Sequence, residues 1–381
     1  MLFLALVMAT SPAWSKSSQD NFKYSPVTNS GKKWRIAYYQ GGPSKNYYPY
    51  LASTVNGLID LGWIENIDLP ANKENDTQIL WNWLAHNIKS DFVEFVADAY
   101  YTANWDSDLR GTLVKSIIHR LNTAKDVDLI IAMGTWAGKD LATNDHVTPT
   151  MVMSSTDPLR AGIIASNEDS GYDHVHARVD PLRYERQIRV FQNIIGFKKL
   201  GVAYENSVLG RSYAAIDLIE KVAKEKNFEI VRCFTKDDIP DQNSAGESVI
   251  KCFEELVMQA DALYVVQQNG VNVKSIPKLV AIANEHRIPT FSQLGSEEVR
   301  YGFLLSIARA GGFKPVGRFL ATTMAKIFNG AKPRQLNQVF EEGPAIAINL
   351  KTAEMIGLYL YADVLAAADE IYREIENPQE Q

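Results

Sequence analysis

Two short polar segments of the sequence combine residue types that can bind a ligand or act on one. Each follows an apolar run typical of a buried strand, and together they supply Thr135, Trp136, Ser155, Thr156 and Asp157. Hydroxyl groups donate and accept hydrogen bonds, an indole stacks on flat apolar groups, and a carboxylate binds a cation or transfers a proton. Residues of these types indicate that the two segments form either one wall of a ligand-binding cleft or a small acid–base site.

The first segment, GTWAGKD at 134–140, superficially resembles a phosphate-binding loop. That loop requires four residues between its first glycine and Gly-Lys-Ser/Thr, whereas three residues separate the glycines here. Asp140 also stands where the magnesium-binding hydroxyl is needed. The spacing therefore argues against a nucleotide site.

Other catalytic motifs are absent from the sequence. No GxGxxG follows a predicted strand, which argues against a nicotinamide or flavin enzyme, and no G-x-S-x-G nucleophile motif occurs. His174 and His176 could place two imidazoles on one face of a strand, but no third ligand stands at a supporting spacing. We expect neither a cofactor nor a metal ion.

The polar segments belong to two successive α/β units. Strands are predicted at 35–39, 92–97, 128–133 and 150–154, and then at 200–204, 228–234, 262–266 and 290–292. The segments between these strands have apolar residues at helical spacing. Strands that alternate with helices favour parallel sheets that are covered on both faces. Because 381 residues exceed the roughly 100–200 typical of one domain, we expect two lobes.

In open α/β sheets, ligands bind at the carboxyl ends of the strands. The residues at these ends are our candidate ligand-binding residues: Tyr39, Gln40, Thr135, Trp136, Ser155, Thr156, Asp157, Asn206, Gln267, Asn269 and Ser292. Thr135 would begin a helix, whose free N–H groups suit an anionic group. Since polar residues recur after almost every strand of both units, we expect a cleft between the lobes.

The ends and the overall charge of the chain indicate its surroundings. The net charge of −6 gives no basic surface for nucleic acid. Leu2–Ala9 is a short apolar run before Ala13-Trp14-Ser15, so residues 1–15 are predicted to be a secretory signal peptide and residues 16–33 a flexible leader. We therefore expect an exported, periplasmic protein.

The sequence contains two cysteines, Cys233 and Cys252. They can form a disulfide in an oxidising compartment, because one ends a predicted strand and the other lies on the following helix. Two buried free thiols are an equally good interpretation. Their spacing indicates neither a metal site nor a redox motif.

The order of several segments resembles that of the substrate-binding proteins of ABC importers, and among them the type I periplasmic subfamily whose members bind tryptophan or tyrosine. The segments include LIIAMGTWAGKDLA, PTMVMSSTDPLRAGII, DALYVVQQNGVNVKSI and AIAINLKTAEMIGL. The resemblance covers nearly all of residues 34–360. It implies two Rossmann-like lobes, three crossovers between them, and a ligand cleft that closes by hinge motion.

The resemblance also implies how the chain is divided. The crossovers would fall near 157–178, 297–302 and 332–337, with lobe 1 at 34–156 plus 303–331 and lobe 2 at 157–302 plus 332–381. Gln40, Thr135, Trp136, Ser155, Thr156 and Asp157 would face the cleft from one side, and Asn206, Gln267, Asn269 and Ser292 from the other. The chain departs from the family at 267–269, where many relatives carry an acidic residue that meets an ammonium group.

These observations lead to one main hypothesis and two alternatives. The main hypothesis is a monomeric solute receptor, not an enzyme, that passes an aromatic amino acid or a related aromatic or carboxylated metabolite to the transmembrane subunits of an ABC permease. One alternative is a sensor that presents its liganded form to a membrane signalling protein. The other is an α/β enzyme that uses Asp157 as acid or base with help from Glu205.

Overall fold

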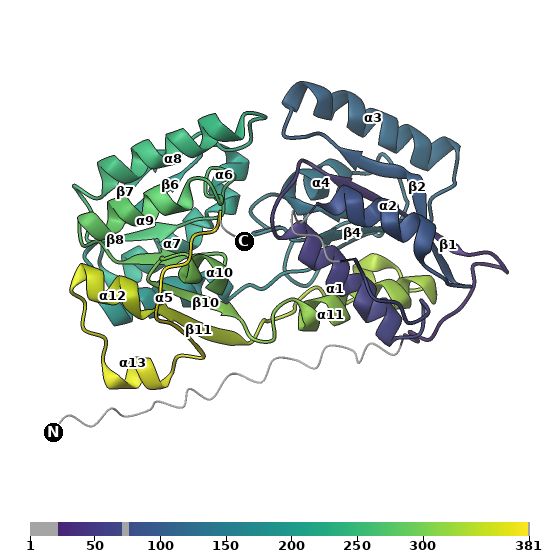
Figure 1. Ribbon diagram of the computed structural model, residues 1–381. Helices are drawn as coiled ribbons and strands as arrows, with labels where there is room; N and C mark the ends of the chain where they lie inside the picture. Colours follow the sequence, from purple (N-terminus) through teal and green to yellow (C-terminus); the bar gives the residue numbers. More distant parts are fainter. Residues whose placement is uncertain (1–21, 71–75, 380–381) are drawn as a thin grey trace.

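The computed structural model describes residues 22–70 and 76–379, which form two α/β lobes joined near the middle of the molecule (Figure 1). Each lobe has its own sheet, so the predicted two-lobed α/β architecture is confirmed. The predicted signal peptide lies outside the described residues. Within them, no helix combines the length and apolar character that crossing a membrane requires.

Lobe 1 is built on a parallel five-stranded sheet in the order β2-β1-β3-β4-β5. Its strands are β1 (Trp34–Gln40), β2 (Val93–Thr102), β3 (Leu129–Met133), β4 (Thr150–Met153) and β5 (Val175–Ala177). β3 and β4 are buried throughout, as continuous apolar runs predict for strands covered on both faces. The sheet therefore needs helices on both sides.

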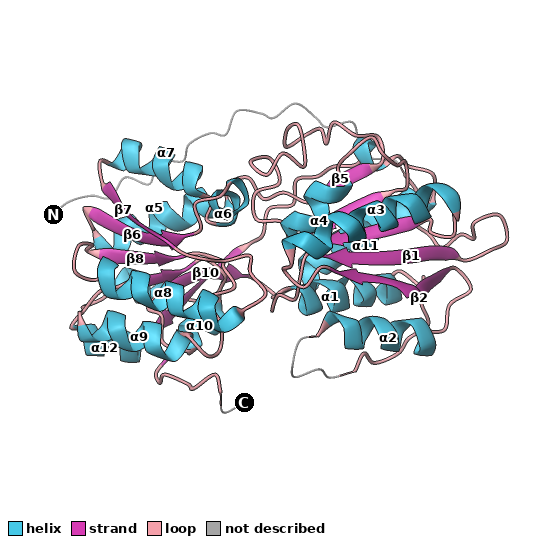
Figure 2. Ribbon diagram, turned by 90° about the horizontal axis from the view of Figure 1, so that it is seen from above, coloured by secondary structure: helices cyan, strands magenta, loops and turns pink. Residues whose placement is uncertain are grey.

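Helices cover both faces of this sheet (Figure 2). They are α1 (Tyr47–Asp60), α2 (Thr77–Asn87), α3 (Ser107–Thr123), α4 (Gly134–Leu141) and α11 (Lys314–Phe328), with a short 3-10 turn η1 (Pro333–Gln335). Because successive strand residues point to opposite faces, Ile36 and Tyr38 pack with α1, α2 and α11, whereas Ala37 and Tyr39 pack with α3 and α4.

Lobe 2 has a seven-stranded sheet in the order β12-β11-β10-β9-β8-β6-β7. Its strands are β6 (Lys199–Tyr204), β7 (Glu229–Phe234), β8 (Ala262–Val265), β9 (Thr290–Ser292), β10 (Leu305–Arg309), β11 (Pro344–Asn349) and β12 (Glu370–Tyr372). β10 and β11 are antiparallel, and the other neighbours are parallel. β7 lies at one edge and pairs only with β6.

The helices of lobe 2 also lie on both sides of its sheet (Figure 2). They are α5 (Arg183–Ile195), α6 (Val208–Tyr213), α7 (Ile216–Lys226), α8 (Gln242–Leu256), α9 (Ile276–Glu285), α10 (Ser296–Arg300), α12 (Leu350–Ile356) and α13 (Ala362–Ala366). α5 and α7 share one core with the sheet, and α8 and α9 share another. Cys233 and Cys252, whose state the sequence left open, form a disulfide between β7 and α8.

One strand lies in the other lobe from the one expected. The predicted division assigned residues 303–331 to lobe 1, but β10 at the start of this range pairs with β9 and β11 in the sheet of lobe 2. The helix that follows, α11, does pack in lobe 1, where Gly57 of α1 and Gly317 of α11 allow the two helices to approach closely. The chain therefore crosses between the lobes after β10 rather than before it.

The observed crossovers correct the predicted lobe boundaries. The chain passes between the lobes at 178–182, 310–313 and 340–343. Residues after 156 remain in lobe 1 because Ala161 and Ile163 pack in its core and β5 pairs with β4. The segment after Lys332 also remains there, since Lys332 bonds Asp173 and the carbonyl of Asn337 contacts His176.

A buried ion cluster links the three crossovers. Glu342, on the third, accepts from Arg178 at 2.8 Å, Arg183 at 3.2 Å and Arg309 at 2.8 Å. Asp180 accepts the backbone N–H of Glu342 at 3.0 Å. Burial would raise the pKa of Glu342, but the three arginines lower it to about 2. One carboxylate therefore joins all three segments on which the lobes would hinge.

The described part of the predicted leader is attached to lobe 1. The carbonyls of Tyr24 and Ser25 accept from Trp63 at 3.0 Å and Asn329 at 2.9 Å, and Phe22 packs against the lobe 1 core. The expectation of a flexible leader is therefore wrong for residues 22–33, because their backbone groups bond to the folded lobe.

Candidate ligand-binding site

A cavity of about 140 Å³ lies between the two lobes. Lobe 1 contributes Lys45, Tyr47, Trp105, Thr135 and Thr156, and lobe 2 contributes Tyr213, Asp237, Asp238, Gln267, Asn269 and Leu294. The volume is close to that of an apolar cavity of about 150 Å³ that accepts benzene. The cavity therefore has room for an aromatic ring.

The first wall of the cavity is the junction of β3 and α4. Gly134 has φ +86°, and a Cβ there would lie 1.8 Å from the hydroxyl of Tyr47, so only glycine fits this turn. The turn begins α4, where Thr135 lines the cavity with its hydroxyl 3.1 Å from that of Ser155. The helix N-terminus therefore presents partial positive charge and hydroxyl groups at the cavity.

Two tryptophans shape the loop that follows β1. The rings of Trp105 and Trp136 meet edge to face, with centroids 5.4 Å apart. They pack so closely on Gly41 and Gly42 that any Cβ there would clash, and the Trp105 indole donates to the Pro43 carbonyl at 3.1 Å. The aromatic packing thereby holds this loop, including Lys45, at the rim of the cavity.

The second wall is the segment between β7 and α8, which carries Asp237 and Asp238. Asp238 accepts from the Trp136 indole at 2.6 Å and from the Tyr213 hydroxyl at 2.7 Å. Asp237 accepts the backbone N–H of Asn269 at 2.6 Å. Glu205 accepts the backbone N–H groups of both aspartates, at 2.8 and 3.3 Å. Three carboxylates therefore converge at this side of the cavity.

Burial dominates the titration of the two aspartates. It raises the pKa of Asp238 to about 6, although the hydrogen bonds from Tyr213 and Trp136 oppose the shift. Burial and the neighbouring Asp238 raise the pKa of Asp237 well above its ordinary value. In the part of the chain that the structure describes, the donors to both carboxylates are neutral groups. The pair is thus poised to receive a cation or a proton.

The structure brings together six of the eleven candidate residues. Thr135, Thr156, Gln267 and Asn269 line the cavity. Ser155 lies behind Thr135, and Trp136 bonds Asp238 across the lobes. These six come from the ends of β3, β4 and β8, so the carboxyl ends of these strands do face one another.

The other five candidates lie away from the cavity. The hydroxyl of Tyr39 donates to Asp140 on the α4 side of the sheet, and Gln40 accepts from Tyr38 and Thr77 in the core. Ser292 donates to Glu298, and Asn206 is exposed.

The fifth, Asp157, accepts the backbone N–H of Arg160 at 2.9 Å and caps a turn. Its carboxylate does not line the cavity. The enzyme hypothesis, which relies on Asp157 as acid or base, therefore gains no support from its placement.

Several cavity residues were not among the candidates: Lys45, Tyr47, Trp105, Tyr213, Asp237 and Asp238. The consecutive aspartates were the available signal, because they stand between a predicted strand and a predicted helix. The first of these aspartates lies three residues after the end of β7, so a search for polar residues directly after a strand does not include it.

Direct contacts between the lobes surround the cavity. Lys45 of lobe 1 pairs with the buried Glu298 of lobe 2. Thr156 donates to Gln267 at 3.2 Å. On the outer side, Arg160 pairs with Asp217 at 3.0 Å. The lobes are therefore in direct contact around the cavity in this structure.

Comparison with known protein families gives one match that covers most of the chain. The family described as ABC transporter substrate binding protein matches residues 100–372. A "Tyrosine-binding protein" of Clostridioides difficile (strain R20291) is 29% identical over 213 residues, which are 56% of this chain and 54% of that protein. The matched region thus spans about half of this relative.

Solved structures show the same fold at low identity. A domain from Streptococcus pneumoniae in complex with L-Trp superposes with a TM-score of 0.68 and 18% identity over 89% of this chain and 100% of that chain. A ligand-free, open substrate-binding protein with adhesive properties from Clostridium difficile gives a TM-score of 0.58 and 19% identity over 90% and 100%. Both likenesses support the two-lobed type I periplasmic binding protein fold.

Proposed function

Because the chain belongs to the family of ABC transporter substrate-binding proteins, we propose that it is an exported receptor that encloses an aromatic amino acid between its lobes and delivers it to an ABC permease. The observation that carries this proposal is the buried acidic pair Asp237 and Asp238, which faces a helix N-terminus across a cavity of single-ring size. Opposite charges at two ends of one small cavity suit a zwitterion.

The ammonium group of the ligand would lie against Asp238. This carboxylate is ionised above its pKa of about 6. Its two hydrogen-bond donors, Trp136 and Tyr213, are neutral, and Arg110 offsets only part of its charge. An ammonium donates up to three hydrogen bonds, which Asp238 and the amide oxygen of Gln267 can accept. At 267–269, where many relatives carry an acidic residue, this chain has none. Asp238 would supply the carboxylate from the neighbouring segment instead.

The carboxylate of the ligand would lie at the start of α4. The first N–H groups of a helix carry partial positive charge and bind anions. The hydroxyl of Thr135 adds a donor at the same place, and Lys45 adds a positive charge at the rim. Tyr47, Trp105 and Tyr213 would enclose the ring.

Export is supported by the disulfide and by the family. Disulfides persist in oxidising compartments and are rare in the cytosol. The pair Cys233–Cys252 therefore favours a place outside the cytoplasm. Receptors of this type exchange ligand by opening and closing about a hinge, and the three crossovers joined by Glu342 are suited to this motion.

A thermal-shift panel tests the proposed ligand class. Phenylalanine, tyrosine and tryptophan are expected to raise the melting temperature, because a ligand at 100 times its Kd stabilises by about 2.7 kcal/mol. Analogues that lack either the ammonium or the carboxylate group should shift it less at equal concentration. If no aromatic amino acid shifts it while sugars or nucleosides do, the proposal is wrong.

Affinity for the amino acid is also expected to depend on pH. The pKa of Asp238 is raised to about 6, so its charge is lost as pH falls through this value. Titration calorimetry should show constant affinity between pH 7 and 8 and up to about tenfold weaker binding for each pH unit below 6. A deaminated analogue provides the control, since its affinity should not fall in this way. Equal affinity for the amino acid at pH 5 and 8 would contradict the role of Asp238.

A further inference from the structure

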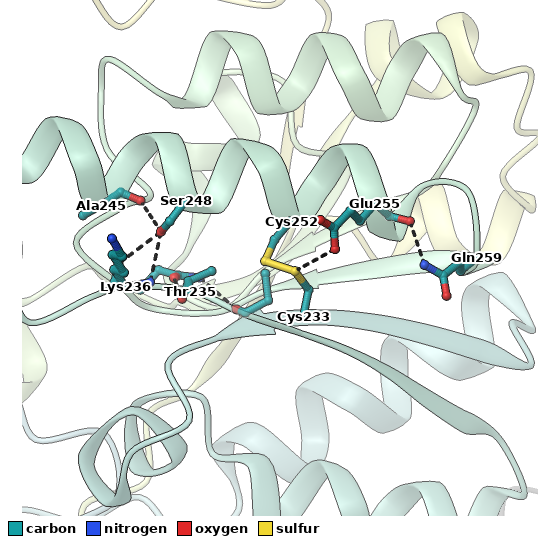
Figure 3. Close-up of a disulfide and its surroundings, with 10 residues drawn as sticks. Cys233, Thr235, Lys236, Ala245, Ser248, Cys252, Glu255 and Gln259 are labelled. Carbon is teal, nitrogen blue, oxygen red and sulfur yellow. Dashed lines mark hydrogen bonds between the residues drawn. A yellow bond between two sulfur atoms is a disulfide. The ribbon is translucent and has the colours of Figure 1, made fainter.

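The disulfide, shown in Figure 3, brackets in sequence the segment that carries the two cavity aspartates. Cys233 is the penultimate residue of β7, Cys252 lies on α8, and their Cα atoms are 5.5 Å apart. Asp237 and Asp238 lie between these cysteines in sequence, before α8 begins at Gln242. The cross-link therefore closes a loop of the chain that contains both carboxylates.

The two ends of this cross-link differ in how firmly they are otherwise held. β7 is an edge strand that pairs only with β6, and the residues on its outer side are partly or fully exposed. Cys252, in contrast, is buried in the core that α8 shares with the sheet. The disulfide thus attaches the weakly held end of an edge strand to a well-packed helix.

Hydrogen bonds also hold the segment between the cysteines, among them those that Asp237 accepts from Asn269 and that Asp238 accepts from Trp136 and Tyr213. Ser248 of α8 accepts the N–H of Lys236 at 3.0 Å (Figure 3). The hydroxyl of Thr235 donates to Gln268 at 2.8 Å, and Glu205 accepts the N–H groups of the two aspartates. The last of these bonds depends on a third carboxylate in an already acidic region.

Repulsion among these carboxylates opposes the arrangement in the empty cavity. The charge of Asp238 helps to raise the pKa of Asp237, and Glu205 helps to raise the pKa of both aspartates. Asp238 and Glu205 are like charges in a partly buried site and repel each other, so a restraint on the segment favours this arrangement until a cation arrives. A covalent cross-link supplies it by limiting the conformations open to the segment.

We propose that the Cys233–Cys252 disulfide is a positioning element that holds Asp237 and Asp238 at the cavity, so that ligand affinity depends on the redox state of this pair. This inference rests on the proposed function. Reduction by a dithiol transfers two electrons and two protons to the disulfide, gives two cysteine thiols, and oxidises the dithiol to its own disulfide. The freed β7 end then lets the acidic segment move away from the ligand ammonium.

The test compares the oxidised protein with the C233A/C252A variant and with protein reduced by dithiothreitol. By calorimetry, the variant and the reduced protein are each expected to bind L-tyrosine or L-tryptophan about tenfold more weakly, because pre-organisation of the ammonium partner is lost. Their deaminated analogues should lose less than about threefold, since they make no bond to Asp238. Equal losses for both kinds of ligand would overturn the positioning role.

A double-mutant cycle with D238N separates positioning from general destabilisation. Once Asp238 is neutral, removal of the disulfide should cost little further affinity, because both changes act on one interaction. Ile219→Val, in the α7 core on the other side of the sheet, serves as a control that lowers stability and leaves affinity unchanged. Fully additive losses from D238N and C233A/C252A would contradict the inference.

Hydrogen exchange of the unliganded protein gives a readout that needs no ligand. The amides of 235–241 are expected to exchange faster in C233A/C252A, while those of β8 and β9 remain unchanged. If these amides keep their protection, the disulfide does not hold the segment and the inference is wrong. If they lose it but the oxidised protein binds no aromatic amino acid, the positioning stands and the proposed ligand falls.

Discussion

Replacement of Asp238 with asparagine is expected to weaken binding of an aromatic amino acid by about 30-fold or more, since loss of one partner of a buried charge pair costs about 2–5 kcal/mol. Asparagine keeps an oxygen that can accept from Trp136 and Tyr213, so the contact between the lobes is retained. Only the negative charge that would face the ligand ammonium is removed. Titration calorimetry at pH 7.5 measures the loss directly.

Asp237→Asn is the matched control for this experiment. Asp237 is the more deeply buried of the two, and burial raises its pKa well above the ordinary value, whereas the pKa of Asp238 is about 6, so at pH 7.5 the negative charge resides mainly on Asp238. The control variant should therefore bind the amino acid within about threefold of wild type. Equal losses in both variants, or no loss in D238N, would show that Asp238 is not the ammonium partner.

The division of the chain into lobes was predictable only in part from the sequence. Alternating apolar strands and amphipathic helices predicted two α/β units, and α11 was correctly placed in lobe 1. β10 was not, because an apolar run such as FLLSI suits the centre of either sheet. Its lobe is decided by pairing of Leu305 with Phe291 and of Leu305 with Ile348, which are contacts distant in sequence. Hydrophobic periodicity predicts which face of a strand or helix is buried, but it does not predict which strands or helices lie beside it.

The strand-end pattern pointed to cavity-lining residues where the polar residue follows its strand closely. Thr135 comes two residues after β3, and Gln267 two residues after β8, and both line the cavity. It failed at β1, where Gln40 points into the core and accepts from Thr77 of α2. A position at a strand end therefore limits where a side chain lies but does not determine which side of the sheet it faces.

The acidic pair was missed for a different reason. Asp237 and Asp238 lie in a connection that runs from Phe234 to the start of α8, and this connection returns to the cavity because Glu205 and Asn269 bond to it. Neither contact is visible in local sequence. Two adjacent acids in a loop are usually solvated, whereas here tertiary packing buries them.

Replacement of Glu342 with glutamine is expected to lower the free energy of unfolding by about 3–5 kcal/mol, because breaking a buried ion pair leaves its partners uncompensated. Arg178, Arg183 and Arg309 all bond to this carboxylate, and the side chain is 7% exposed. Glutamine has nearly the same shape but no charge, so three guanidinium groups would lose this partner, and Arg178 would keep its pair with Asp180 at 3.7 Å. Chemical denaturation of the unliganded protein at pH 7 measures the loss.

The pH dependence of stability distinguishes this charge effect from a packing defect. The pKa of Glu342 is about 2 in the folded protein against an ordinary 4.5, so its stabilising contribution is present above about pH 4.5 and is lost as pH falls towards 2. Wild type should therefore lose stability over this range more steeply than E342Q, and the two should converge at low pH. Glu354→Gln, which removes an exposed pair with Lys351, is the matched control and should change stability by less than about 1 kcal/mol. A difference between wild type and E342Q that stays constant from pH 7 to 2 would mean that shape, and not charge, holds the three crossovers together.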